Sequence, residues 1–156
     1  HRCLPALRRP RQRAMAQEQI RSEVDVTSYD LLKASHIVAV VIWFGGMMAV
    51  ALSLNRGNDM AALLAWDRYV TTPAIVVSWA LGLAMATWAG WFASGWMIAK
   101  LALVLVLSAM HGLLAGQLHR KAANAGAASR IDERLVLGAM GVALAGIALL
   151  VVGKPF

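Results

Sequence analysis

The fold is decided by the stretch LLKASHIVAVVIWFGGMMAVALSL, residues Leu31–Leu54, in which Lys33 and His36 are the only ionisable side chains. A helix needs about 20 mostly apolar residues to cross a bilayer, and this stretch is long enough. Three further stretches have the same character, and they cover residues 72–89, 96–118 and 135–153. None of them alternates apolar and polar residues as a barrel strand does. The sequence therefore predicts an all-α integral membrane four-helix bundle.

The composition excludes most other classes of protein. Of the 156 residues, 60% are hydrophobic and 15% are charged, whereas soluble domains average about 45–50% apolar and about 25% charged. A small soluble domain keeps much of its surface in water and has no room to hide this much apolar area. The single cysteine, Cys3, excludes a disulfide framework and a cysteine-based zinc site.

The first 28 residues differ from the rest, and we expect a disordered polar and basic tail over 1–28, followed by a four-span domain over 29–156. Residues 1–14 (HRCLPALRRPRQRA) contain five of the fifteen Lys and Arg residues. We expect Met15 to be the natural initiator and residues 1–14 to be upstream read-through, with a basic targeting or lipid-binding arm as the alternative. Removing those five arginines lowers the net charge from +7 to +2, so the sequence predicts no nucleic-acid partner.

The connections between spans predict how the chain sits in the membrane. Asn55–Asp59 has the composition of a turn, and Met60–Tyr69 is a short amphipathic stretch expected to lie at the membrane interface. Cytoplasmic connections carry an excess of Lys and Arg. The face with the first and third connections carries the larger basic set, which is Arg56, Arg68, Arg120, Lys121, Arg130 and Arg134. We therefore expect a multi-pass protein of the cell inner membrane with both termini on the non-cytoplasmic side.

His36 is the first candidate for a functional side chain. Ionisable groups at membrane depth cost at least about 2.5–3.5 kcal/mol at the helix centre, so each one needs a reason. Residues seven or eleven apart share a helix face, which aligns His36 with Trp43 and Met47 in a stripe facing the bundle. The imidazole either bonds a neighbouring backbone carbonyl or serves as an axial ligand to haem iron. Trp43 is then a candidate cofactor-binding residue beside it.

Two lysines are predicted at the same level as His36. The first and third spans run in the same direction and the fourth returns, so Lys100 and Lys154 should lie near His36 at one face. Two ammonium groups beside an imidazole suit a planar ligand held by its carboxylates, such as a porphyrin with two propionates. The alternative for Lys100 is snorkelling to the head groups. His111 lies about 16 Å further along the axis than Lys100, so it could not easily share one iron with His36, and its alternative is a satisfied bundle histidine.

Four segments together resemble the HemJ-type protoporphyrinogen IX oxidases, small bacterial membrane proteins related to the CopD-like group. The resemblance covers residues 30–156 and includes a Lys-x-x-His pair, a Thr-Pro-Ala start of the second span and a Lys-Pro-Phe end. The segments are LKASHIVAVVIWFGG (Leu32–Gly46), RYVTTPA (Arg68–Ala74), WMIAKLALVLVLSAMHG (Trp96–Gly112) and VVGKPF (Val151–Phe156).

The resemblance implies an oxidoreductase of porphyrin biosynthesis that oxidises protoporphyrinogen IX to protoporphyrin IX and binds b-type haem. It implies that electrons leave toward the respiratory chain, with quinone as a candidate acceptor. His36 matches the family's span-one histidine, and Lys100 matches its span-three lysine, which we expect to be the catalytic residue that grips propionates. His111 matches a histidine of the family's Tyr-His-Gly stretch, with Met110 in place of Tyr, and joins Lys154 among the cofactor-binding candidates.

The chain also departs from the family, and several alternatives stay open. Ala51–Asp59 replaces a longer first connection that usually contains an Arg-Leu-Phe-Val-Tyr-His-like stretch, and Ile98 stands where the family often has the His of Trp-x-His-x-Lys. An inactive paralogue, a non-catalytic b-type cytochrome that relays electrons and a plain scaffold subunit are alternatives. A copper-handling protein is suggested by Met47 and Met48 beside His36. Membrane lipid is an expected partner, and a homo-oligomer is a further alternative.

Overall fold

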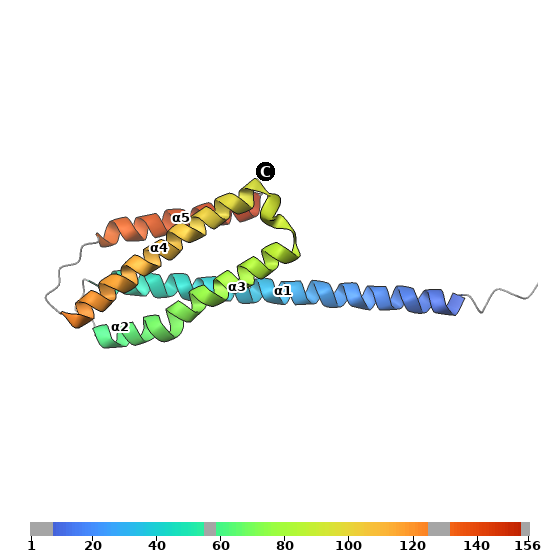
Figure 1. The fold of residues 1–156 in the computed structure, drawn as a ribbon, viewed down its shortest axis with the longest axis horizontal. Helices are drawn as coiled ribbons and strands as arrows, with labels where there is room; N and C mark the ends of the chain where they lie inside the picture. Colours follow the sequence, from blue (N-terminus) through green and yellow to red (C-terminus); the bar gives the residue numbers. More distant parts are fainter. Residues whose placement is uncertain (1–7, 55–58, 125–131, 154–156) are drawn as a thin grey trace, which may run out of the picture.

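The structure is a computed structural model, and it describes residues 8–54, 59–124 and 132–153. These residues form helices and their connections, with no strand among them, as Figure 1 shows. The elements are α1 (Arg8–Ser53), α2 (Met60–Trp66), the π-helix η1 (Asp67–Thr71), α3 (Thr72–Trp88), the 3-10 turn η2 (Trp91–Ala93), α4 (Gly95–Ala123) and α5 (Glu133–Gly153).

Four helical stretches are long and apolar enough to cross a membrane, which confirms the predicted all-α four-span bundle. They cover Gln12–Ser53, Met60–Trp88, Gly95–Ala123 and Arg134–Gly153. Large apolar side chains such as Leu135, Val142 and Leu149 are more than 70% exposed, which suits an outer surface covered by lipid tails. In Figure 1, α1 and α4 run in one direction while α3 and α5 run in the other.

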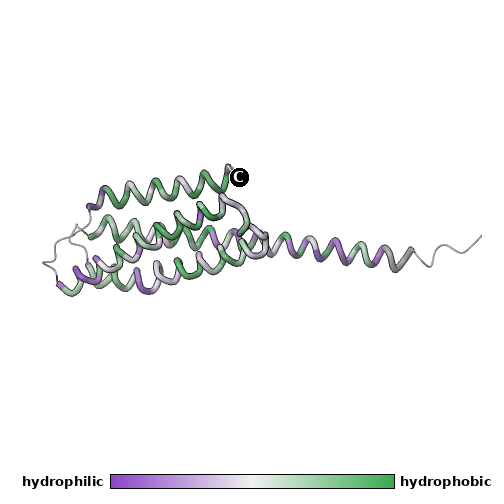
Figure 2. Tube along the Cα trace, turned by 45° about the horizontal axis from the view of Figure 1, so that its top comes forward, coloured by the Kyte–Doolittle hydropathy of each residue, from purple (hydrophilic) through white to green (hydrophobic). Residues whose placement is uncertain are grey.

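The N-terminal region differs from the predicted disordered tail in the part that the structure describes. Residues 8–28 continue α1 as regular helix beyond the bundle, and Figure 2 shows the mixed polar and apolar character of this extension. The side chains of residues 12–27 are all exposed. Once a helix has formed, each added residue gains a hydrogen bond without the cost of starting a new helix. The polar residues before the membrane span therefore continue its helix. The first seven residues of the predicted tail lie outside the described residues.

The second span is longer than predicted, because Met60–Tyr69 does not lie apart from it at the interface. α2, η1 and α3 follow one another without a break, and the candidate span covers 29 residues from Met60 to Trp88. The wide turn η1 lies just before Pro73, which has no N–H to donate and crowds the preceding turn of a helix. The Thr72 N–H bonds the Asp67 carbonyl across this turn. The π-helix therefore accommodates the proline inside a continuous helix.

Aromatic residues mark one end of the bundle, and their position along the helices is here called the aromatic level. The Tyr29 ring lies edge-on to Trp88 and Trp91 at centroid distances of 6.2 and 6.5 Å, and Trp91 lies 5.4 Å from Trp96. Tyr and Trp are enriched where a span meets the membrane interface. These contacts bring α1, α3 and α4 to a common level, from which depth along each helix can be counted.

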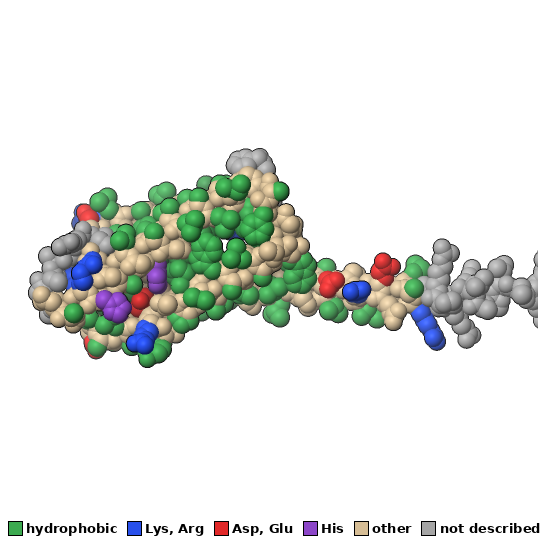
Figure 3. Space-filling view, viewed as in Figure 1, with side chains coloured by type: hydrophobic (Ala, Val, Ile, Leu, Met, Phe, Trp, Pro, Cys, Tyr) green, Lys and Arg blue, Asp and Glu red, His purple; other side chains and the backbone are tan. Residues whose placement is uncertain are grey.

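The opposite end, where α1 and α4 finish and α2 and α5 begin, is here called the α1–α2 end. Lys121 Nζ donates a hydrogen bond to the Leu54 carbonyl, a favourable place for a cation because the end of a helix carries partial negative charge. Figure 3 shows basic and histidine side chains gathered at this end. The described members of the predicted basic set all belong to it, namely Arg68, Arg120, Lys121 and Arg134. Arg56 and Arg130 lie outside the described residues.

The main hydrophobic core lies between the helices in the half of the bundle nearer the α1–α2 end. Its cluster includes Trp43, Met47, Leu114 and Met140, each 3% exposed or less. α1 and η1 approach closely at Gly46, where an added Cβ would lie 2.9 Å from Thr71 Cβ. Glycine at this position therefore allows Thr71 to reach the core.

Candidate functional site

The first candidate site, here called the His36 site, is formed by His36, Gly82 and Lys100 on three different helices. His36 comes seven residues after Tyr29, which places it about 10 Å below the aromatic level at a rise of 1.5 Å per residue. Its ring faces α3 at Gly82, where an added Cβ would lie 3.0 Å from His36 Cε1. A side chain at position 82 would therefore collide with the imidazole in its present position.

Lys100 joins this site from α4. It comes four residues after Trp96, about 6 Å below the aromatic level, and lies within electrostatic range of the imidazole. The structure thus brings together two of the three side chains that the sequence predicts at one level. Lys154, the third, lies outside the described residues.

The His36 ring hydrogen-bonds the backbone of Ser78 in α3, as the alternative to a haem ligand expects, but one of its nitrogens stays unused. Its Nδ1 is buried and has no hydrogen-bond partner. Buried polar atoms are nearly always bonded, so an unpaired one in a native structure asks for an explanation. A half-buried imidazole with a spare nitrogen is able to bind a metal-centred cofactor or a polar substrate group.

Trp43, the predicted neighbour of His36 on the same stripe, packs into the main core. It is 2% exposed and belongs to the cluster with Leu107 and Leu114 of α4. It lies seven residues beyond His36, about 10 Å deeper along α1. Met47 lies one turn further and is 1% exposed. The structure therefore assigns this part of the stripe to packing, although the Trp43 Nε1 also has no partner.

His111 belongs to a second polar site in the other half of the bundle, here called the Asp67–His111 site. Its Nε2 lies 4.0 Å from Asp67 Oδ1, and both residues are buried. His111 comes fifteen residues after Trp96, about 22 Å below the aromatic level. This places it about 12 Å deeper than His36, so the structure separates the two histidines and does not offer them to one iron.

Thr71 stands four residues after Asp67 in η1. It is fully buried, and its hydroxyl has no hydrogen-bond partner. Asp67 and Thr71 are the two buried residues of the π-helix, and single π turns inside α-helices are frequent at functional sites. The hydrophobicity pattern could not find this site, because Asp67 stands beside Arg68 in a stretch that resembled a surface helix.

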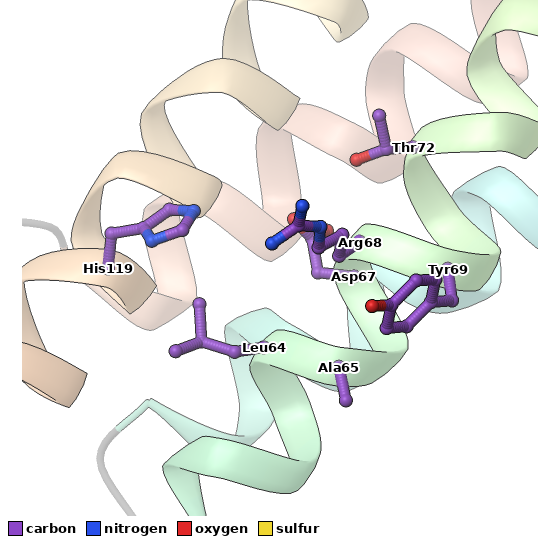
Figure 4. Close-up of a pocket in the computed structure, with 7 residues that line it drawn as sticks. All are labelled: Leu64, Ala65, Asp67, Arg68, Tyr69, Thr72 and His119. Atoms are coloured by element: carbon purple, nitrogen blue, oxygen red, sulfur yellow. The ribbon is translucent and has the colours of Figure 1, made fainter.

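A cavity beside the second site is lined by residues of α2, η1, α3 and α4. Its volume is about 460 Å³, and Figure 4 shows His119 of α4 facing Asp67 and Arg68 across it. The Arg68 guanidinium carbon lies 5.8 Å from the centre of the Tyr69 ring. The full lining is Leu64, Ala65, Asp67, Arg68, Tyr69, Thr72 and His119. Asp67 thus lines a cavity although it is buried.

Between the two sites, one hydrogen bond ties α3 to α4. Trp79 Nε1 donates to Ser108 Oγ at 3.1 Å, and the Ser108 hydroxyl donates to the Val104 carbonyl at 2.8 Å. These groups are fully used in holding the helices together. The tie fixes the rotation of α3 against α4, and with it the positions of Gly82 and Lys100 at the His36 site.

Within the described parts of the chain, no three His, Cys, Asp or Glu side chains gather closely enough to hold a metal ion. Comparison with protein-family models, with curated proteins and with solved structures gives no match. The function must therefore be argued from the two sites themselves.

Proposed function

We propose that this chain is a membrane oxidoreductase of haem biosynthesis that uses b-type haem to oxidise protoporphyrinogen IX to protoporphyrin IX. The observation that carries the proposal is that His36 and Lys100, on different helices, lie at similar depths of an apolar bundle and within electrostatic range of each other. An imidazole and an ammonium group are the two kinds of side chain that a carboxylated tetrapyrrole needs, one for its iron and one for a propionate.

The residues at the His36 site fit haem by their chemistry. His36 offers an imidazole with an unpartnered buried nitrogen, and imidazole is the commonest protein ligand of haem iron. Gly82 faces the ring without a side chain of its own. His36 would therefore hold the iron as an axial ligand, while Lys100 and, by the sequence prediction, Lys154 would hold carboxylates. Bound haem would supply the one-electron chemistry that side chains lack.

The protein's own part is to bind, orient and protect the substrate. The Lys100 ammonium would pair with a substrate propionate in a setting of low polarity, where an ion pair is stronger than in water. That pairing would hold the apolar macrocycle against the helices at the level of His36. The surrounding apolar side chains would keep water from the reduced macrocycle. The reaction removes six electrons and six protons, and we propose quinone as the carrier of electrons to the respiratory chain.

The proposed location is the inner membrane, with the α1–α2 end on the cytoplasmic side. The basic residues that the structure gathers there support this orientation through the positive-inside rule. Both termini then lie on the other side.

The test compares Lys100→Met with Lys33→Met in purified full-length protein in lipid nanodiscs. Lys33 is an exposed lysine of α1, so it controls for loss of charge. We expect Lys100→Met to retain haem and to lose at least ten-fold in the rate of protoporphyrin formation, while Lys33→Met behaves like the wild type. Haem without porphyrin formation in the wild type would replace the enzyme with a non-catalytic b-type cytochrome. Copper without haem would replace it with a copper-handling protein.

A further inference from the structure

A buried acid and a buried histidine face each other in the half of the bundle that the proposed haem site does not use. Asp67 is 6% exposed and His111 is 9% exposed. Ionisable side chains within spans are rare, and those that occur often belong to proton relays. Neither side chain is needed to close the fold, because the core around them is already apolar. We therefore expect the pair of Asp67 and His111 to have a role other than packing.

We propose that Asp67 and His111 form an acid–base pair that carries protons between the interior of the bundle and the α1–α2 end. The pair joins α4 to the π-helix of the second span, and its open side is the cavity that Asp67 lines. The ligand of this site is a proton, exchanged with water in the cavity that Asp67 lines.

The distance between His111 and Asp67 is short enough that a small movement brings them into a hydrogen bond. At 4.0 Å, His111 Nε2 and Asp67 Oδ1 are close enough for an ion pair but too far apart for a hydrogen bond. Transfer requires an approach to about 2.6–3.2 Å or one bridging water. The Thr71 hydroxyl, four residues after Asp67 in η1, has no protein partner and is able to bond such a water.

The surroundings of the pair favour exchange of protons on the side of the cavity. Charged and titratable neighbours come from η1 and α4, and they are Arg68, Tyr69 and His119 around the cavity. The residues that α1 and α5 bury in this region, among them Met47 and Met140, are not ionisable. A proton that reaches Asp67 therefore meets an exposed imidazole on the side of the cavity and apolar side chains elsewhere.

The step is a proton transfer without a change of oxidation state. The N–H bond of a protonated His111 breaks as an O–H bond forms on the Asp67 carboxylate. The carboxylic acid then passes the proton to water in the cavity or to His119. Asp67 returns to the carboxylate, and His111 returns to its protonated state only when it takes the next proton from the interior of the bundle. No electron moves.

The role in turnover rests on the proposed function, in which six protons must leave for each porphyrin formed. The experiment therefore measures proton exchange in two ways, one of which needs no substrate. The variants are Asp67→Asn and His111→Gln, which keep size and polarity. Asp25→Asn, on the exposed part of α1, is the matched control.

The measurement without substrate follows the ring nitrogens of His111 by ¹⁵N NMR of labelled protein in lipid vesicles. We expect the His111 signal to titrate with the pH of the medium, and its titration curve to change in Asp67→Asn but not in Asp25→Asn. Haem content should be the same in all variants, because His36 is remote. A His111 signal that ignores pH between about 5 and 8, or that ignores the loss of Asp67, would overturn the relay.

The measurement with substrate follows porphyrin formation. We expect a fall of five-fold or more in Asp67→Asn and His111→Gln, with recovery on adding a small membrane-permeant weak acid that shuttles protons. A normal rate in both variants would overturn the role in turnover while the proposed function stands. If the wild type forms no porphyrin, the proposed function fails and the NMR titration alone decides the relay.

Discussion

The His36 site and the Asp67–His111 site contain the same kind of side chain in opposite halves of one bundle, but their partners differ. His36 has a cation within electrostatic range and glycine against its ring, whereas His111 has beside it a carboxylate that lines a cavity. A histidine beside a lysine is suited to an anionic, metal-centred ligand. A histidine beside an aspartate is suited to moving protons. The two sites therefore differ in the charged residue beside the histidine, which is Lys100 in one and Asp67 in the other.

The largest difference between the two sites is expected when each histidine is removed in turn. We expect His36→Ala to abolish the haem absorption band of the purified protein, because the proposed axial ligand is lost. His111→Ala should keep the band, since His111 lies about 12 Å deeper along the bundle. Absorption spectra of the two variants at equal protein concentration check this. Loss of the band in His111→Ala alone would exchange the roles of the two sites.

A smaller effect is expected when the His36 ring is displaced and not removed. The Cβ of Gly82→Ala would lie 3.0 Å from His36 Cε1, so the ring must shift by a few tenths of an ångström. We expect weaker haem retention and a shifted absorption maximum. Gly45→Ala is the control, because nothing lies within 4 Å of its Cβ. Identical spectra for both variants would mean that the ring contact at Gly82 does not matter for the cofactor.

The smallest effect on haem is expected from crowding at the other site. The Cβ of Gly46→Ala would lie 2.9 Å from Thr71 Cβ, and overpacking of this kind costs about 1–3 kcal/mol. The thermal unfolding midpoint in detergent should fall relative to Gly45→Ala, with the haem band unchanged. A midpoint that does not fall would show that η1 moves freely away from α1.

The sequence predicted the spans and the His36 site because both stand out against an apolar background. Lys33 and His36 are the only ionisable residues in Leu31–Leu54. Because consecutive spans alternate in direction, the first and third spans run the same way. The level of Lys100 beside His36 then comes from counting residues along helices.

The second site could not be predicted in the same way. Asp67 follows the apolar stretch Met60–Trp66 and stands beside Arg68, and it is buried where α2, η1 and α3 run on without a break. That continuity depends on the wide turn that accommodates Pro73, and single wide turns leave no periodic signal in a sequence. The helical extension over 8–28 was missed for a related reason, since its polar residues follow a span that already forms the helix.

The central claim is that the His36 site serves porphyrin oxidation, and its most direct test is rescue of a bacterial strain that lacks protoporphyrinogen oxidase. The wild-type chain, produced from residue 15 onward, is predicted to restore growth and protoporphyrin formation, while His36→Ala and Lys100→Met inserted in equal amounts restore neither. Failure of the wild type, with correct insertion shown by membrane fractionation, would contradict the account. Full rescue by His36→Ala would contradict it as well.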